Sequence, residues 1–287
     1  MDVVGLNIGM DMTSMATVVA MAETFRAWIK SNSNDYMQVG QYDDIKTAKQ
    51  SGKLGIFFDL EGGTSLGGRL EMVQSYYDLG VRWMLMAYNK NNDLAGGCHD
   101  KDQGLTEFGR NVLVEMNRVG MLPCCSHMGE RSALEICERS SGPVILSHSN
   151  PRALCNHPRN VSNQLINACA GTGGVIGLNG IGIFLGNNDC SIDTFVRHID
   201  HVVQLVGVEH VGLGLDYVFD KQELEDWITG NPDSFPIDGG YATGMNMIEP
   251  ERLPDIAEAL AVRGYKEDNI AAIFGNNFGR LAQQIWQ

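Results

Sequence analysis

The stretch LGIFFDLEGGTSLGGRLEMVQSYYDLGVRWMLMAY, residues 54–88, decides the fold. An apolar run at 54–60 predicts a buried strand, and an amphipathic stretch at 67–79 predicts a helix. A second apolar run at 83–88 predicts another strand. Parallel sheets are built from repeated units of strand, helix and strand. This stretch therefore predicts an α/β fold.

The same alternation continues on both sides of this unit. Further strands are predicted at 3–9, 122–126, 144–147, 174–178 and 210–215, and further helices at 15–29, 107–119, 192–205, 254–263 and 269–286. The total of seven strands is one short of a closed (β/α)8 barrel. Because the first run starts so near Met1, we expect a TIM-like (β/α)8 barrel whose first strand is missing before Met1.

The chain is expected to form one domain over residues 1–287, because no linker or low-complexity segment divides it. Residues 217–249 interrupt the regular alternation and are rich in Gly, Asn, Pro and aromatic residues. They follow the last predicted strand, where barrels carry the loops that bind substrates. We therefore interpret residues 217–249 as a long loop and a candidate lid.

Composition excludes several classes of partner. The chain has 35 acidic and 21 basic residues, a formal net charge of −14, and no cluster of Lys and Arg. Nucleic acid and anionic membranes are therefore not expected partners. The seven cysteines form no CxxC pair, which is typical of reduced thiols. No basic residue precedes Arg26, so no signal peptide is recognised and we expect a cytoplasmic protein.

Polar side chains follow four of the predicted strands. Glu61 ends GIFFDLE, His127 ends PCCSH, His148 ends VILSH, and Asp216 ends VGLGLD. Barrel enzymes carry their reactive groups at these carboxyl ends, so the four side chains are expected to converge. One carboxylate and two imidazoles are a typical ligand set for zinc, which can then activate water. A single histidine at a strand end is more often structural, and the pairing of two Ser-His ends favours a shared site.

Two charged residues have both a functional and a structural interpretation. Asp216 is either a proton shuttle beside the metal or a turn residue. Arg159 either pairs with a substrate carboxylate or forms a surface ion pair. The other histidines, His99 and His157 among them, are expected to be structural or solvent-exposed.

Several motifs together resemble the renal (membrane) dipeptidase family of the amidohydrolase superfamily, in its bacterial form. They are DLEGG, LTEFGRNVLVEMNRVG leading to CCSH, VILSHSNPRAL followed by PRNV, HIDHVVQLVGVEHVGLGLDY and GNNFGRL. The resemblance implies a zinc-dependent hydrolase of small dipeptides, often with a D-residue at the C-terminal side, with one or two metal ions. It implies that Glu61 bridges two metals and that His127 and His148 bind the second. It also implies that Asp216 is catalytic and that Arg159 binds the substrate carboxylate.

The chain departs from the family pattern at three places. Nothing before Val3 supplies the His-x-Asp that binds the first metal, so that site is expected to be incomplete. Tyr88 stands where some members have a substrate-contacting histidine, and it is expected to contact substrate. Cys124 and Cys125 replace an acidic residue. Two alternatives therefore stay open: a catalytically impaired barrel, or a hydrolase of another amide or a lactone. A homodimer is also left open.

Overall fold

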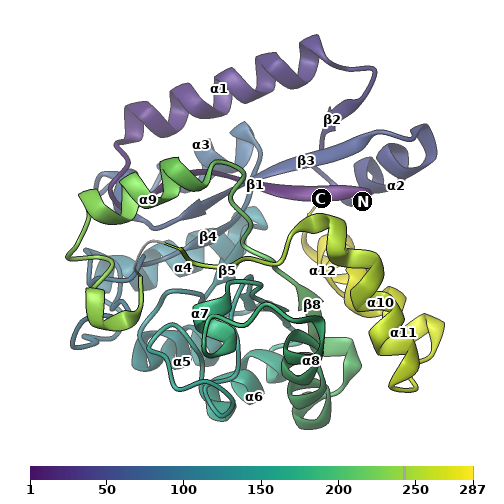
Figure 1. Ribbon diagram of the computed structural model, residues 1–287. Helices are drawn as coiled ribbons and strands as arrows, with labels where there is room; N and C mark the ends of the chain where they lie inside the picture. The colour runs from purple at the N-terminus through teal and green to yellow at the C-terminus, as the bar shows by residue number, and fades with distance from the viewer. Residues whose placement is uncertain (242–243, 287) are drawn as a thin grey trace.

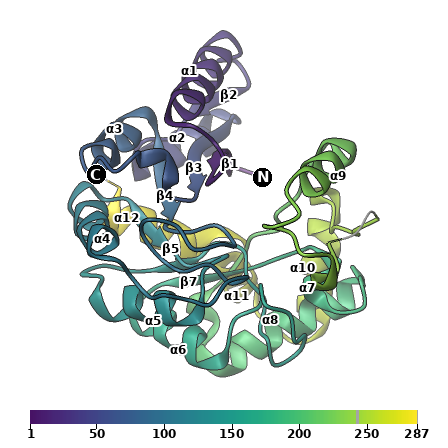
Figure 2. The same cartoon turned by 90° about the vertical axis from the view of Figure 1, so that its left-hand side faces the viewer.

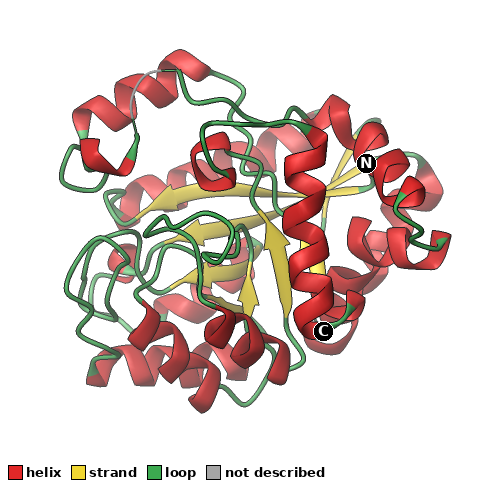
Figure 3. Ribbon diagram, turned by 60° about the horizontal axis from the view of Figure 1, so that its bottom comes forward, coloured by secondary structure: helices red, strands yellow, loops and turns green. Residues whose placement is uncertain are grey.

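The computed structural model describes residues 1–241 and 244–286, in which a parallel sheet curls through the molecule with helices on its outside (Figures 1 and 3). The strands are β1 Val3–Met10, β2 Tyr36–Gln38, β3 Leu54–Glu61, β4 Val81–Leu85, β5 Leu122–Cys124, β6 Ile145–Leu146, β7 Val175–Leu178 and β8 Val211–Leu213. The helices are α1 Met15–Ser31, α2 Tyr42–Ser51, α3 Met72–Leu79, α4 Glu107–Val119, α5 Glu130–Arg139, α6 Asn163–Gly171, α7 Gly182–Leu185, α8 Ile192–Val206, α9 Lys221–Gly230, α10 Leu253–Val262, α11 Glu267–Ala271 and α12 Asn277–Ile285. Shorter turns are η1 Thr64–Leu66, η2 Val208–His210, η3 Ile237–Gly239, η4 Pro250–Arg252 and the π-helical η5 Ala272–Asn276.

The strands follow the winding of a (β/α)8 barrel. Their order is β1-β3-β4-β5-β6-β7-β8, and every pair is parallel. The short β2 pairs with the first half of β3. Figure 2 shows the helices following the same curl, from α3 through α4, α5 and α6 to α8. The predicted α/β, TIM-like class is confirmed.

The sheet is open between its first and last strands, since no ladder joins β1 to β8 in the described residues. All seven predicted strands are present, and β2 is an eighth. β2 is the sequence YMQ in a mainly polar stretch and contains no apolar run, so the sequence pattern does not predict it. The expectation of a strand before Met1 is not tested by the described residues and stays a prediction.

Alternation along β3 explains how the sheet separates two cores. Ile56, Phe58 and Leu60 belong to the core beneath the outer helices. Phe57 belongs to a second cluster, inside the curl, with Leu85 and with Trp286 from the end of the chain. Successive residues of a strand point to opposite faces. Asp59 and Glu61 therefore share the inner face with Phe57.

Three predicted segments differ from the structure. The helix predicted at 67–79 begins at Met72, because Gly67 and Gly68 adopt positive φ of 59° and 72°. The single helix predicted at 269–286 is broken, since Gly275 leaves the helical conformation between α11 and α12. The loop predicted at 217–249 contains α9, and residues 242–243 of it lie outside the described residues.

The ends of the correctly predicted helices have local causes. Ser14 accepts a hydrogen bond from the Thr17 amide at the start of α1, and Thr106 accepts one from Gly109 at the start of α4. Such caps satisfy amides that have no partner within the helix. Helix α4 ends at Gly120 with φ 85°, a conformation that glycine adopts without strain. Within the described residues no helix is both long and apolar enough to span a bilayer.

Candidate metal centre

Glu61, His127 and His148 meet at the carboxyl ends of three strands. Glu61 is the last residue of β3, and the histidines follow β5 and β6. One potential ligand atom from each lies within 4.8 Å of the others. The Glu61 Oε1 and His148 Nε2 atoms are 3.3 Å apart. The structure therefore brings together the three residues that the sequence proposed as ligands.

Left-handed backbone conformations gather around this trio. The described chain has five non-glycine residues with positive φ, and three of them, Asn89, His127 and Asp216, lie at strand ends beside the site. This conformation costs a residue with a Cβ about 1–2 kcal/mol. Backbone strain of this kind persists where the surrounding structure holds the residue in place, and it is common at active sites and ligand-binding sites. At His127 and Asp216 it turns the chain sharply after a strand.

The histidine rings are held by neighbouring polar groups. His127 Nδ1 lies 2.7 Å from the Asn89 side-chain oxygen, and His148 Nδ1 lies 2.8 Å from Ser147 Oγ. The Cys124 thiol is 3.0 Å from the same Ser147 oxygen. Contacts of this type fix the orientation of metal-binding imidazoles. Cys124, one of the departures from the family pattern, thus supports His148 through a serine.

The electrostatics of the site fit a cation. Burial raises the pKa of Glu61 well above its ordinary value, and the negative charges of Asp216 and Asp59 raise it further. Burial lowers the pKa of His148 to about 4 and that of His127 well below its ordinary value. The imidazoles are therefore neutral and keep a lone pair for a ligand. His148 Nε2 is buried and has no hydrogen-bond partner among the described residues.

This donor set suits a divalent metal. Crowded carboxylates repel one another, and a bound cation removes that repulsion. Two imidazole nitrogens and one carboxylate oxygen match the preferences of zinc. Zinc also needs neutral histidines, and the burial of both rings supplies them.

Asp216, Arg159 and Tyr88 surround the trio. Asp216 accepts a hydrogen bond of 2.9 Å from the Asn179 side chain, and its charge raises the pKa of Glu61 and His148. The Tyr88 ring stacks on His127, with centroids 4.1 Å apart. Burial raises the pKa of Tyr88 well above its ordinary value, so the phenol keeps its proton.

Arg159 is 3% exposed, so the interpretation as a surface ion pair is wrong. Its Nε and Nη2 atoms are buried without a hydrogen-bond partner in the described part of the chain. Its positive charge lowers the pKa values of Glu61, His127 and His148.

Sequence reasoning missed two residues at the site. Asp59 is 7% exposed, accepts a hydrogen bond of 3.2 Å from Asn7, and has its pKa raised to about 7, chiefly by burial. Its position two residues before Glu61 on a predicted strand was a usable signal, because such residues share a face. Asn89 gave no such signal, since its importance comes from contacts distant in sequence.

His99 and His157, expected to be structural, both contact the segment after β8. His99 Nε2 is 2.8 Å from the Tyr241 hydroxyl, and His157 Nε2 is 2.7 Å from the Gly239 carbonyl oxygen. Burial lowers the pKa of His99 to about 4 and also lowers that of His157. Both therefore act as neutral hydrogen-bonding groups that hold this segment near the site.

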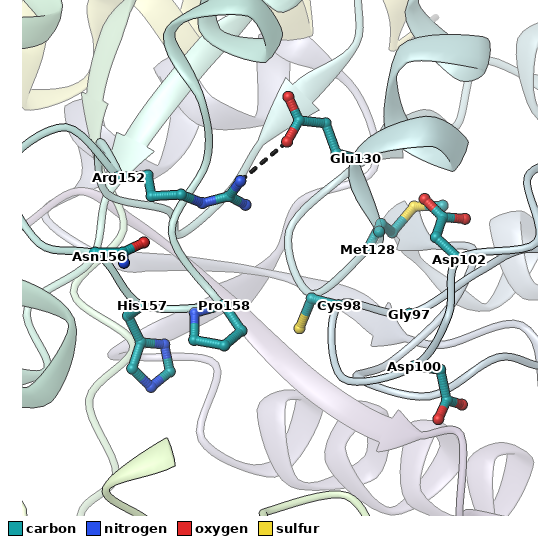
Figure 4. Close-up of a pocket in the computed structure, with 11 residues that line it drawn as sticks. Gly97, Cys98, Asp100, Asp102, Met128, Glu130, Arg152, Asn156, His157 and Pro158 are labelled. Carbon is teal, nitrogen blue, oxygen red and sulfur yellow. Dashed lines mark hydrogen bonds and ion pairs between the residues drawn. The ribbon is translucent and has the colours of Figure 1, made fainter. Parts of the chain in front are cut away.

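A hollow of about 510 Å³ is lined in part by Cys98 (Figure 4), whose thiol also contacts Asn89. Figure 4 shows the ion pair between Glu130 and Arg152 along one side of it, with an N–O distance of 3.0 Å. None of the three candidate ligands lines this hollow. Its charged side chains are already ion-paired or hydrogen-bonded within the protein, so we regard it as a neighbour of the site rather than the site itself.

A curled parallel sheet with three candidate metal ligands at the carboxyl ends of its strands is the arrangement expected of a barrel metallo-hydrolase. The family model of the membrane dipeptidases (peptidase family M19) matches residues 10–231. The chain belongs to this family. The departures at Tyr88 and Cys124 are therefore variations within it.

Individual relatives agree with this assignment. An uncharacterized dipeptidase of Schizosaccharomyces pombe is 31% identical over 214 residues, which are 71% of this chain; the chain spans about half, 51%, of that relative. The crystal structure of an amidohydrolase from Pseudomonas aeruginosa is 28% identical with a TM-score of 0.88, and the match covers all of this chain and 89% of that one. A metallo peptidase from Rhodobacter sphaeroides, liganded with a phosphinate mimic of L-Ala-D-Ala, is 21% identical with a TM-score of 0.79 over 95% of this chain and 75% of that one, and shows the same fold.

Proposed function

We propose that this chain is a metallo-dipeptidase that hydrolyses the peptide bond of small dipeptides, including those with a C-terminal D-residue. Glu61, His127 and His148 would hold zinc, and Asp216 and Arg159 would act on the substrate. The observation that carries this proposal is the buried guanidinium of Arg159, which has hydrogen-bond donors without acceptors in the described structure. Membership of the membrane dipeptidase family supports it.

The buried guanidinium of Arg159 supports an anionic ligand at this position. A buried charge without a counter-ion is costly, and a planar guanidinium pairs best with a carboxylate. The Phe184 ring lies 5.2 Å from the Arg159 guanidinium carbon in a cation–π contact, which attracts the charge but is not a conventional hydrogen-bond acceptor for its N–H groups. The free carboxylate of a dipeptide would satisfy these donors. If Arg159 fixes the C-terminal carboxylate near the metal ligands, only a short peptide has its peptide bond at the metal ligands.

Asp216 is suited to handling protons. Its backbone φ of 58° turns the side chain at the end of β8, and Asn179 donates to one of its carboxylate oxygens. A carboxylate that accepts a proton from attacking water can pass it to the departing amine. Asp216 could also bind the substrate ammonium group by its charge.

Zinc, as one or two ions, would supply Lewis-acid chemistry to water and carbonyl oxygens when bound. Glu61, His127 and His148 form a trio of donors for one ion. Tyr88 covers one face of His127 and excludes water from it. We further propose a cytoplasmic location, supported by the free state of all seven cysteines.

Hydrolysis of L-Ala-D-Ala by zinc-loaded protein tests the proposal. Arg159→Met should lower kcat/KM by about 30-fold or more, mainly through KM, because truncating one member of a buried charge pair costs about 2–5 kcal/mol. Arg152→Met is the matched control, since Arg152 is ion-paired with Glu130 and none of its hydrogen bonds reaches a residue of the trio. The amide of L-Ala-D-Ala, which lacks the carboxylate, should be a poor substrate of the wild type.

Three results would contradict the proposal. Absence of turnover by the zinc-loaded wild type on a panel of dipeptides would favour the catalytically impaired barrel. Equal losses in Arg159→Met and Arg152→Met would remove Arg159 from the site. Turnover of lactones in place of dipeptides would favour the other hydrolase alternative.

A further inference from the structure

Asn89 joins three parts of the structure that are far apart in the sequence. It is fully buried, follows Tyr88 after β4, and has a left-handed φ of 59°. Its side-chain oxygen is 2.7 Å from His127 Nδ1, and the Cys98 thiol donates to that oxygen over 3.5 Å. Its side-chain nitrogen donates to the Ser234 carbonyl oxygen over 3.0 Å. One amide therefore contacts a candidate metal ligand and the segment after β8.

The Ser234 contact fixes which way the amide points. A backbone carbonyl oxygen only accepts, so the Asn89 atom that faces Ser234 must be the NH2 group. The Asn89 oxygen then faces His127, and an amide oxygen also only accepts. His127 Nδ1 must therefore carry the proton, which leaves Nε2 with a free lone pair. This is the tautomer that can bind a metal through Nε2.

Ser234 belongs to Tyr217–Tyr241, which we name the cover segment. Besides Asn89, the cover segment is held by the His99–Tyr241 and His157–Gly239 hydrogen bonds. Its Phe235 ring meets Tyr88 edge-on, with centroids 6.1 Å apart. Asn89 thus contacts both Ser234 of the cover segment and His127 of the trio. Among the hydrogen bonds of the described residues, the Asn89–Ser234 bond is the one that links the cover segment to a side chain in contact with a histidine of the trio.

We propose that Asn89 is a positioning residue that couples docking of the cover segment to metal binding at His127. When Ser234 holds the amide, the Asn89 oxygen is fixed on His127 and selects the metal-binding tautomer. When the cover segment leaves, the amide is free to rotate and present either end to the ring. By thermodynamic reciprocity, metal at His127 favours the docked cover segment to the same degree. This inference rests on the proposed metal centre.

The coupling is tested with zinc alone, by measuring two quantities on the full chain. Competition with a chelating dye gives the zinc Kd, and amide hydrogen exchange of residues 217–241 gives the stability of docking. In the wild type, zinc should slow exchange of this segment about 5- to 150-fold, the usual range of coupling between two sites.

Two substitutions separate positioning from coupling. Asn89→Asp keeps an acceptor for His127 but cannot donate to Ser234, so zinc should still bind while its effect on exchange is lost. Asn89→Gly removes both contacts, and glycine adopts the positive φ of this position without strain. Zinc affinity should fall about 10- to 100-fold, the usual effect of removing a group that hydrogen-bonds to a metal-binding histidine. Asn91→Ala is the matched control, since the Asn91 side chain forms hydrogen bonds with Gly97 and Lys101 but with neither His127 nor the cover segment.

The outcomes distinguish the two proposals. If the wild type binds zinc but exchange of the cover segment does not change, the coupling is refuted and the metal centre stands. If Asn89→Asp keeps the full zinc effect on exchange, Asn89 is not the coupling residue. If the wild type binds no zinc, the metal centre fails and the coupling fails with it.

Discussion

Asp59→Asn is expected to stabilise the metal-free protein at neutral and alkaline pH. Asp59 lies on the inner face of β3, 7% exposed, and its only hydrogen bond among the described residues is the one from Asn7. Burial, with the charge of Asp216, raises its pKa from 3.8 to about 7. At about 1.4 kcal/mol per pH unit, ionised Asp59 costs the fold about 4 kcal/mol.

The sign follows from the raised pKa. Well below pH 3.8 the carboxyl group is protonated in both folded and unfolded chains, so it causes no loss. As the pH rises to 7, the unfolded chain ionises freely and the folded chain does not, so stability falls. Asparagine cannot ionise, and its side-chain oxygen can still accept from Asn7. The gain from Asp59→Asn should therefore be below about 1 kcal/mol at pH 4 and about 4 kcal/mol at pH 8.

Urea unfolding in the presence of a chelator, at pH values from 4 to 8, measures this difference. Asp35→Asn, at an exposed position, is the matched control and should change stability by less than about 0.5 kcal/mol. A gain of equal size at pH 4 and pH 8 would show that packing, not ionisation, is responsible. A loss at pH 8 would refute the electrostatic reasoning. Added zinc should reduce the gain, because a nearby cation favours the ionised carboxylate.

Two further predictions concern the metal. Ser147→Ala removes the hydroxyl that contacts His148 Nδ1 and should weaken zinc binding about 10- to 100-fold in a dye competition assay; Ser149→Ala, whose hydroxyl contacts Ser126, should not. Zinc at 100 times its Kd should stabilise the fold by about 2.7 kcal/mol and raise Tm by about 5 °C in a thermal scan, with reversal by chelator. An unchanged Tm would argue against a metal centre in this chain.

Local sequence was enough for most of the fold. Each apolar run that the sequence predicts as a strand is a strand of the sheet. Such runs can be recognised locally, because an apolar run and the polar residues that flank it involve only a few consecutive residues. The helix at 107–119 was predicted to the residue, since Thr106 and Gly120 mark its ends. The predictions failed where a strand has no apolar run, as at β2, or where a glycine broke a continuous apolar stripe, as at Gly275.

The candidate ligands were also accessible from the sequence, for a topological reason. Glu61, His127 and His148 each end a strand of a parallel sheet, and parallel strands wound in order bring their carboxyl ends to one edge. The family motifs pointed to the same three residues. Their role as zinc ligands remains a prediction.

Only the tertiary structure decided how these groups are supported and charged. Ser234 lies 145 residues after Asn89, and nothing in either local sequence indicates that they meet. The burial of Arg159 and the raised pKa of Asp59 depend on which segments enclose them. The sequence by itself therefore determined the strands, the class of fold and the residues at the strand ends, because these follow from local periodicity. The hydrogen bonds, burial and electrostatics of the site follow from packing between distant segments, which local periodicity does not encode.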